Sequence, residues 1–254
     1  MRKRRPLRCE RALRTSRGAQ ADVDAMTSIT DLLRLLQFGD SMLPVGAFAF
    51  SNGLEAAIQQ RVVYNGDSLT QFVQTALGQA AATDGIALIE AHRGAVAGDV
   101  DRIARADNAV QQRKLNEEMR TMTLRMGRKL AELLVHVAPT PLGKEWLMRV
   151  ERRATPGTFP VGLALVFATQ GLSERHAFAA HQYGVATMML SAALRLMKLR
   201  YLDGQAILRA VNALADDAYR RSAAATIDDM AAFAPLTDIL AAIHVKSHVR
   251  MFMN

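Results

Sequence analysis

Residues 67–77, D-S-L-T-Q-F-V-Q-T-A-L, carry the pattern that decides the fold class. Their apolar side chains recur at intervals of three and four positions, at Leu69, Phe72, Val73, Ala76 and Leu77. Residues at this spacing share one face of an α-helix, whereas a half-buried strand alternates at every second position. The stretch therefore predicts an amphipathic helix, with Asp67 or Ser68 as its N-cap.

The same helical spacing continues through the chain from residue 27 onward. Of the 254 residues 50% are hydrophobic, and alanine, leucine and methionine are common, whereas alternating valine, isoleucine and threonine are scarce. This composition supplies a sizeable apolar core and favours helices over strands. We predict a single compact, multi-helix, all-α domain over residues 27–243.

Caps, breakers and apolar spacing give approximate bounds for the individual helices. The first expected elements are a helix capped by Thr30, a helix through 54–58, the helix quoted above with a bend at 84–85, and a polar helix pair over about 99–137. The later ones are an apolar helix ending near Gly171, a helix from Ser173 to about Leu196, a break at 203–204, and helices over about 205–221 and 226–245, with Pro235 near a start or a kink.

The positive charge of the chain is concentrated at its N-terminus. The formal net charge is +8, and residues 1–25 contribute +5 of it, from eight basic and three acidic residues. We expect residues 1–26 to form a basic, disordered extension, since segments of this composition seldom fold. The remaining +3 is typical of an ordinary surface and indicates no nucleic-acid partner. An alternative hypothesis is a helical nucleic-acid-binding regulator that uses the basic arm.

Several classes of active site are missing from the sequence. It contains no phosphate-binding loop, no G-x-S-x-G turn and no H-E-x-x-H pair, and Cys9 is the sole cysteine. No apolar run reaches the roughly 18 residues that a membrane helix needs. We therefore expect a cytoplasmic protein without a membrane partner, without catalytic residues and without a bound cofactor. These absences favour a scaffold or adaptor over an enzyme.

One histidine pair has the spacing of metal ligands. His244 and His248 lie four positions apart and would share a helix face if the last helix continued that far. Two ligands do not make a tight site, although a symmetric dimer could supply four. Because no carboxylate or thiolate accompanies the pair, solvent-facing or interface histidines are the favoured interpretation.

Three further segments carry a resemblance. L-P-V-G-A-F at residues 43–48 leads into F-S-N-G-L-E at 50–55. S-A-A-L-R-L at 191–196 precedes D-G-Q at 203–205. The end of the chain reads P-L-T-D-I-L at 235–240, then His244 and V-R-M-F at 249–252. In order and spacing these segments resemble the UreF family of urease accessory proteins over about residues 30–254, with the basic arm outside.

The resemblance implies a fold, a function and partners. UreF-type proteins are all-helical homodimers that bind the accessory protein UreD, called UreH in some species. The pair recruits the GTPase UreG, and the assembly delivers nickel to apo-urease. The resemblance therefore implies an adaptor that gates GTP hydrolysis while its partners handle nickel and GTP. Val245 departs from the family pattern, which has glutamate there.

Five residues of the first motif have expected structural roles. Pro44 and Gly46 restrict and relax the backbone on either side of Val45. Gly53 belongs to the same motif, and Ser51 and Glu55 share a helix face at positions i and i+4. Glu55 is expected to be either a buried hydrogen-bond anchor for this loop or a partner contact, and we favour the anchor.

Residues 244–254 are predicted to form a partner-binding tail. The segment has few apolar anchors between Ile243 and Met251, so we expect it to become ordered when UreD binds. The candidate partner-binding residues are Arg195, His244, Lys246, His248, Arg250 and Phe252. Arg195 lies in an apolar stretch, where it could contact the GTPase, form a structural ion pair or extend its charge from the helix end to water.

Overall fold

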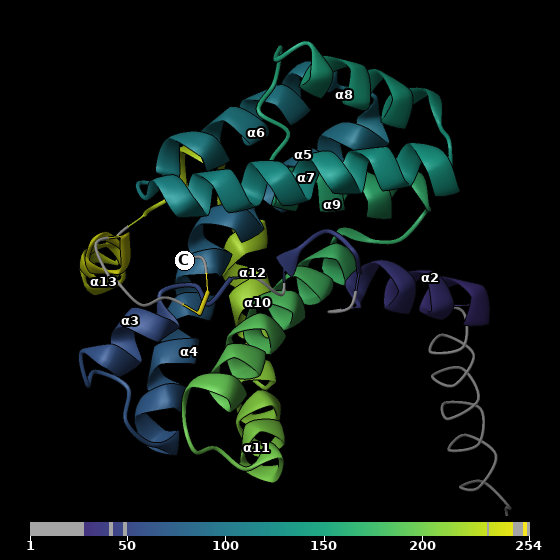
Figure 1. Ribbon diagram of the computed structural model, residues 1–254. Helices are drawn as coiled ribbons and strands as arrows, with labels where there is room; N and C mark the ends of the chain where they lie inside the picture. Colours follow the sequence, from purple (N-terminus) through teal and green to yellow (C-terminus); the bar gives the residue numbers. More distant parts are fainter. Residues whose placement is uncertain (1–27, 41–42, 48–49, 233, 246–250, 253–254) are drawn as a thin grey trace, which may run out of the picture.

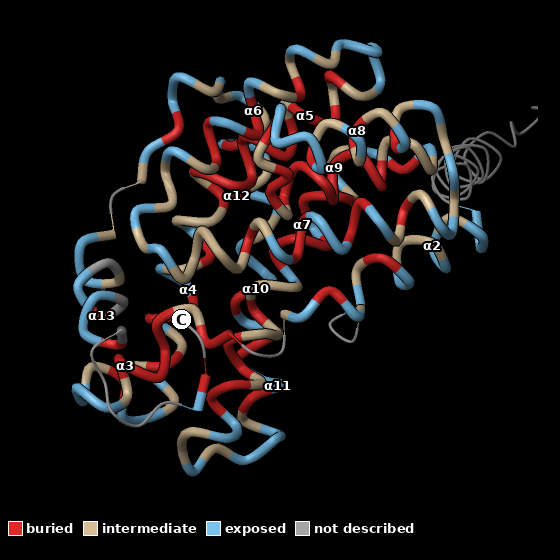
Figure 2. The backbone as a smooth tube through the Cα atoms, turned by 45° about the horizontal axis from the view of Figure 1, so that its top comes forward, coloured by how far each residue is buried: buried red, intermediate tan, exposed pale blue. Residues whose placement is uncertain are grey.

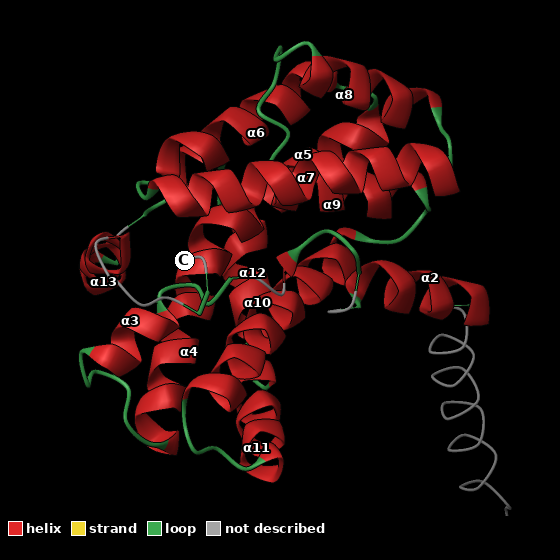
Figure 3. Cartoon of the chain, viewed as in Figure 1, coloured by secondary structure: helices red, strands yellow, loops and turns green. Residues whose placement is uncertain are grey.

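The computed structural model describes residues 28–40, 43–47, 50–232, 234–245 and 251–252. Helices α2 to α13 supply the regular structure of this described part, and no strand occurs in it (Figures 1 and 3). The predicted all-α domain is thus confirmed. The polar helix pair predicted over about 99–137 is also confirmed, as α6 (Val100–Arg113) and α7 (Glu117–Val137).

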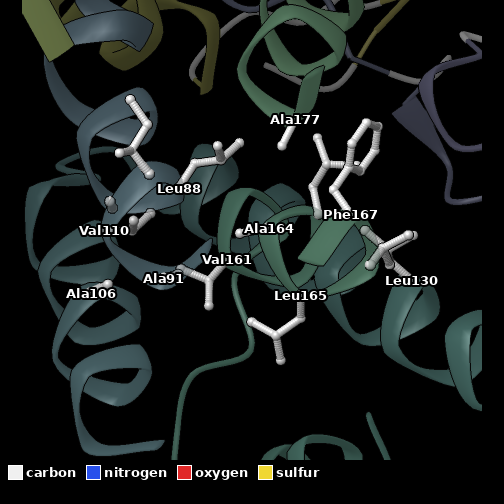
Figure 4. Packing of buried hydrophobic residues seen from close by; sticks show 14 of the residues in the cluster. Leu88, Ala91, Ala106, Val110, Leu130, Val161, Ala164, Leu165, Phe167 and Ala177 are labelled. Atoms are coloured by element: carbon white, nitrogen blue, oxygen red, sulfur yellow. The ribbon is translucent and has the colours of Figure 1, made fainter. Parts of the chain in front are cut away.

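The first of two apolar cores surrounds α9 (Phe159–Thr169). This helix is apolar on every face, and eight of its residues are buried. It packs between α7 and α5 (Ile86–Ala97), with α6 and α8 (Pro141–Glu151) completing the group. Figure 4 shows Val161, Ala164 and Leu165 among side chains from these neighbours. A helix that is hydrophobic all round is stable only when surrounded in this way.

The second core lies at the other end of the molecule. Its helices are α3 (Leu54–Gln59), α4 (Gly66–Ala80), α11 (Tyr201–Asn212) and α13 (Pro235–Val245). The 23-residue α10 (Glu174–Leu196) connects the two cores. Its first half contributes Phe178 to the first core, and its second half contributes Met189 to the second. Figure 2 shows the buried backbone continuing through both regions.

Two helix starts differ from the predicted caps. The helix quoted at the outset begins at Gly66, because Asn65 accepts a hydrogen bond from the Ser68 amide and Ser68 bonds back to Asn65. Neither Asp67 nor Ser68 is its N-cap. Likewise, Ser28 rather than Thr30 caps α2 (Ile29–Gly39). Both helices use a reciprocal capping box, which satisfies donors at both ends of the first turn.

The bend expected at 84–85 is confirmed as a π-helical turn, η2 (Ala81–Gly85), between α4 and α5. It lies where Gly85 packs against the ring of Phe178 so closely that a Cβ would stand 2.7 Å from a ring carbon. A single extra residue in a helical turn redirects the chain without ending the helix. The π-turn thereby carries Asp84 into the interior, where it is 8% exposed.

The expected break at 203–204 is wrong. Asp203 and Gly204 lie in the first turn of α11, where both Asp203 oxygens accept hydrogen bonds of 2.9 Å from Arg200. An aspartate at a helix start is stabilised by the free amides there, so the pair does not form a turn. The predicted helix over 205–221 also divides, since α11 ends at Asn212 and α12 runs over Ala215–Ala224.

The last predicted helix, over 226–245, is shorter in the structure. A 3₁₀ turn, η3 (Ile227–Asp229), comes first, and α13 then begins at Pro235. Proline is favoured in the first helical turn because its missing amide hydrogen would have no partner there. Among the described residues, no helix is both long enough and apolar enough to cross a lipid bilayer.

Candidate functional site

A buried carboxylate in α3 holds backbone from the C-terminal segment. Glu55 is 3% exposed and lies in the first turn of α3, which the left-handed Gly53 (φ 80°) leads into. Its Oε1 accepts a hydrogen bond of 2.8 Å from the Met251 amide, and its Oε2 accepts one of 2.9 Å from the Phe252 amide. Two consecutive peptide groups therefore bind one carboxylate, and charge-assisted bonds of this length are strong.

His244 extends this arrangement towards α7. Its side chain is fully buried in the last turn of α13, and its Nε2 lies 3.1 Å from Oε2 of Glu55. The Nδ1 lies 3.4 Å from Oε2 of Glu118. The imidazole thus links three elements, α3, α7 and α13, through two carboxylates. We call Glu55, His244, Met251 and Phe252 the C-terminal anchor.

The electrostatics of the anchor favour an ionised Glu55. Burial opposes ionisation, but the amides of Met251 and Phe252 together with His244 outweigh it and lower the pKa of Glu55 below its ordinary value. Hydrogen-bond donors stabilise the charged form of a carboxylate and not the neutral form. Glu55 is therefore ionised at neutral pH, where it can accept from both amides.

Arg195 covers the anchor from outside. Its guanidinium carbon lies 4.1 Å from the centroid of the Phe252 ring, and this ring is 5% exposed. A guanidinium stacked on an aromatic face is attracted by the ring quadrupole while it remains in contact with water. Partial burial lowers the pKa of Arg195, although not enough to discharge a guanidinium. The structure thus supplies a contact for Arg195 that its apolar sequence context did not reveal.

Both described ends of the predicted tail contact the body of the protein. Few apolar anchors were predicted between Ile243 and Met251; His244 is buried as a polar residue, and Phe252, just beyond that stretch, belongs to the second core. The anchors were not evident because two of them are backbone amides bound to Glu55. Lys246, His248 and Arg250 lie outside the described residues. Partner binding by the segment stays a prediction.

The first motif has the backbone that its sequence suggests. Gly46 has a φ of 94°, which a side chain would strain, and Pro44 is exposed beside the buried Val45. The Ser51 hydroxyl accepts a bond of 3.4 Å from the Glu55 amide at the start of α3. Glu55 is buried, and among the described residues its carboxylate bonds the C-terminal segment and His244 instead of this loop.

A cavity of about 150 Å³ lies between α2, α7, α9 and α10. Its apolar wall includes Met122 and Met126, and Arg195 lines it together with a buried polar group. In that group Asp84 Oδ2 lies 2.7 Å from Lys114 Nζ and 3.7 Å from His181 Nε2. Burial opposes the charge of Asp84, but Lys114 and His181 hold its pKa far below the ordinary range.

No group of three or more histidine, cysteine, aspartate or glutamate side chains within the described residues is arranged to hold a metal ion. His244, one of the two metal candidates, directs both ring nitrogens at carboxylates. Its proposed companion His248 lies outside the described residues.

Comparison with known proteins identifies the family. The UreF family model matches residues 63–212, which is more than half of the chain. The chain belongs to the UreF family of urease accessory proteins. "Urease accessory protein UreF 2" of Brucella canis is 54% identical over 227 residues, covering 89% of this chain and 93% of that protein. "Urease accessory protein UreF" of Yersinia enterocolitica is 51% identical over 225 residues, covering 89% and 99%.

The sequence singled out several residues of the C-terminal anchor and its surroundings but did not show their contacts. Glu55, His244, Arg195 and Phe252 were all singled out, and the structure brings them together. Glu118 was missed, as were Lys114 and the role of Asp84. Asp84 was noted only as part of a bend, and a charged residue between apolar turns was the available signal.

Proposed function

We propose that this protein is a non-catalytic adaptor of urease maturation. It bridges UreD (UreH) and the GTPase UreG in the cytoplasm while nickel enters apo-urease, and it gates GTP hydrolysis. The observation that carries the proposal is similarity over nearly the full length of relatives named urease accessory protein UreF. The sequence contains no phosphate-binding loop, so the nucleotide chemistry is assigned to UreG. Nickel is the cargo of the assembly.

The C-terminal anchor supports a location for UreD docking. Glu55 fixes the backbone at 251–252, so the residues between α13 and this point start and end at defined places. We assign the contacts to the candidate residues Lys246, His248, Arg250, Arg195 and Phe252.

The proposal also includes a homodimer. Four large apolar side chains of α2 are between 48% and 78% exposed, namely Ile29, Leu32, Leu33 and Leu36. An exposed apolar face of this kind is typical of a protein–protein interface. We propose that such a face is covered in the assembled protein.

The test is co-purification with UreD and UreG, together with nickel-dependent urease activation in a strain that lacks this chain. Restored activation supports the adaptor function, and a chain that fails to restore it contradicts that function. The triple variant Lys246→Ala, His248→Ala, Arg250→Ala is expected to lose most UreD from the co-purified complex.

A matched control removes three exposed basic side chains elsewhere, in the variant Arg105→Ala, Lys144→Ala, Arg209→Ala. It is expected to retain UreD. Equal losses in both variants would show a general charge effect and contradict the assigned contacts. Retention of nucleic acid by the full chain, without any effect on urease, would favour the regulator hypothesis instead.

A further inference from the structure

A polar groove lies on the surface of the first core, away from the C-terminal anchor. It is a groove of about 490 Å³ between α6, α7 and the connection from α8 to α9. Three arginines line it, Arg125, Arg128 and Arg153, and we call it the arginine groove. Figures 1 and 2 both place α6 and α8 at the top of the view, with α13 and α3 lower down at the left.

The arginines of the groove are only partly neutralised. Arg128 Nε lies 3.0 Å from Oε1 of Glu132, but Arg125 and Arg153 have no ion-pair or hydrogen-bond partner for their guanidinium groups among the described residues. The lining also contains Glu151, so with Glu132 on Arg128 two carboxylates oppose the three arginines and the groove keeps a net positive charge. Like charges gathered in a groove raise its potential and attract an anionic ligand.

The connection that lines one side of the groove is held by buried hydrogen bonds. Asp107 of α6 is fully buried and accepts four hydrogen bonds of 2.6–2.8 Å from Thr155, Gly157 and Thr158. On the other side, α7 presses against this connection so closely that a Cβ on Gly127 would overlap the Gly157 carbonyl. The connection that carries Arg153 is therefore fixed before any ligand arrives, which reduces the entropic cost of binding.

Arg153 occupies a backbone position that normally favours glycine. Its φ is 56°, and it ends α8 with bonds from its own amide to the Val150 carbonyl and from the Ala154 amide to the Arg149 carbonyl. This is the left-handed helix end at which glycine is the usual residue. An arginine there is strained, and such strain is found preferentially at functional sites.

Arg61 has the same left-handed backbone conformation as Arg153 but does not line the groove. It ends α3 with a φ of 57°, its amide bonds the Ile58 carbonyl, and the following amide bonds the Ala57 carbonyl. Arg61 is exposed and lies with the second core. Replacing either arginine by glycine removes one charge and relieves the same strain, so the two substitutions form a matched pair.

We propose that the arginine groove binds an extended acidic segment of another protein, rich in aspartate and glutamate and carrying an apolar side chain. The planar guanidinium group of arginine can donate two parallel hydrogen bonds to a carboxylate, and its charge is opposite. Leu124, Val150 and Pro156 offer apolar contacts, and the amides of Asn108 and Gln111 can bond peptide groups. The lining holds no aromatic side chain on which a nucleobase could stack. A protein segment therefore fits better than a nucleic acid.

The test uses the full chain and a fluorescent peptide, Glu-Asp-Leu-Glu-Asp-Glu, that carries a photo-crosslinking group. We expect Arg125→Gln and Arg153→Gly each to weaken peptide binding by about threefold to fivefold, as is usual for a partly exposed charge contact. Arg61→Gly should bind as the parent chain does. Crosslinks should map to residues 108–128 or 150–156.

Thermal unfolding separates binding from folding. Arg153→Gly and Arg61→Gly should each raise the Tm by about 2–4 °C, because glycine relieves the left-handed strain. Weaker peptide binding by the more stable Arg153→Gly protein would therefore support a binding role. Arg125→Gln lies at an exposed helix position and tests the groove even if Arg153→Gly does not fold.

Four outcomes would overturn the proposal. The first is no peptide binding by the parent chain, and the second is equal weakening by Arg61→Gly. The third is crosslinks confined to residues 1–26. The fourth concerns a single-stranded oligonucleotide with the same charge as the peptide. If it binds more tightly than the peptide, and Arg125→Gln and Arg153→Gly abolish its binding, the groove is assigned to nucleic acid.

Discussion

Two buried carboxylates, Asp107 and Glu55, fix irregular backbone in this molecule, one in each core. Each accepts hydrogen bonds from two backbone amides. Asp107 also binds the hydroxyls of Thr155 and Thr158, whereas Glu55 faces His244. The local chemistry is similar, but the segments that the two carboxylates hold are connected differently to the rest of the fold.

The segment bound by Asp107 is a short connection between α8 and α9, both of which pack in the first core. The segment bound by Glu55 lies beyond α13, the last helix in the described part of the chain. Release of the first segment must disturb two core helices, while release of the second exposes Phe252 and leaves α3 to α11 joined. We infer that Asp107 supports the scaffold and that Glu55 fastens a segment that can be released at lower cost.

The largest expected effect follows from Asp107→Ala. It leaves four buried donors without their acceptor, so we expect the free energy of unfolding to fall by about 3–5 kcal/mol. Urea unfolding followed by circular dichroism measures this loss. Asp101→Ala is the control, since Asp101 is an exposed residue of the same helix, and it should change stability by less than about 0.5 kcal/mol. A similar loss in both variants would contradict a specific role for Asp107.

A smaller and more local effect is expected from Glu55→Gln. A glutamine has one side-chain oxygen, so its NH₂ group must face one of the two amides that Glu55 binds. Loss of hydrogen bonds to a charged group should lower the free energy of unfolding by about 2–3 kcal/mol. Amide hydrogen exchange at Phe252 should accelerate far more than exchange in α9. Glu132→Gln, which removes an exposed carboxylate, should leave both rates unchanged. Equal acceleration in the two cores would show that the anchor is not local.

The helices were largely predictable from the sequence because each depends on nearby residues. Apolar spacing located α4 and the polar pair, and Ser173 was correctly expected to cap α10. Boundaries that depend on a single side-chain pair, such as Arg200 with Asp203, were not predictable from composition.

The anchor was only half predictable, for a physical reason. Glu55 and His244 stood out as polar residues in motifs, but their contact spans 189 positions and depends on how α13 packs on α3. Asp107 was missed entirely. The available signal was its place beside Ile103, Ala106 and Val110, where a polar residue joins a buried stripe.

The smallest expected effect is the pH dependence of the anchor. The folded-state pKa of Glu55 lies below its ordinary value, so its contribution to stability is present above the ordinary pKa and is lost as the pH falls through the folded value. The stability difference between the parent chain and Glu55→Gln should therefore be largest at neutral pH and narrow under acid conditions. Urea unfolding at pH 7, 4 and 3 measures that difference, and any contribution of Asp84 drops out of the comparison because both proteins contain it. A difference that stays constant over this range would mean that Glu55 is not stabilised in its charged form, and the distinction between a releasable anchor and a fixed scaffold would then rest on connectivity alone.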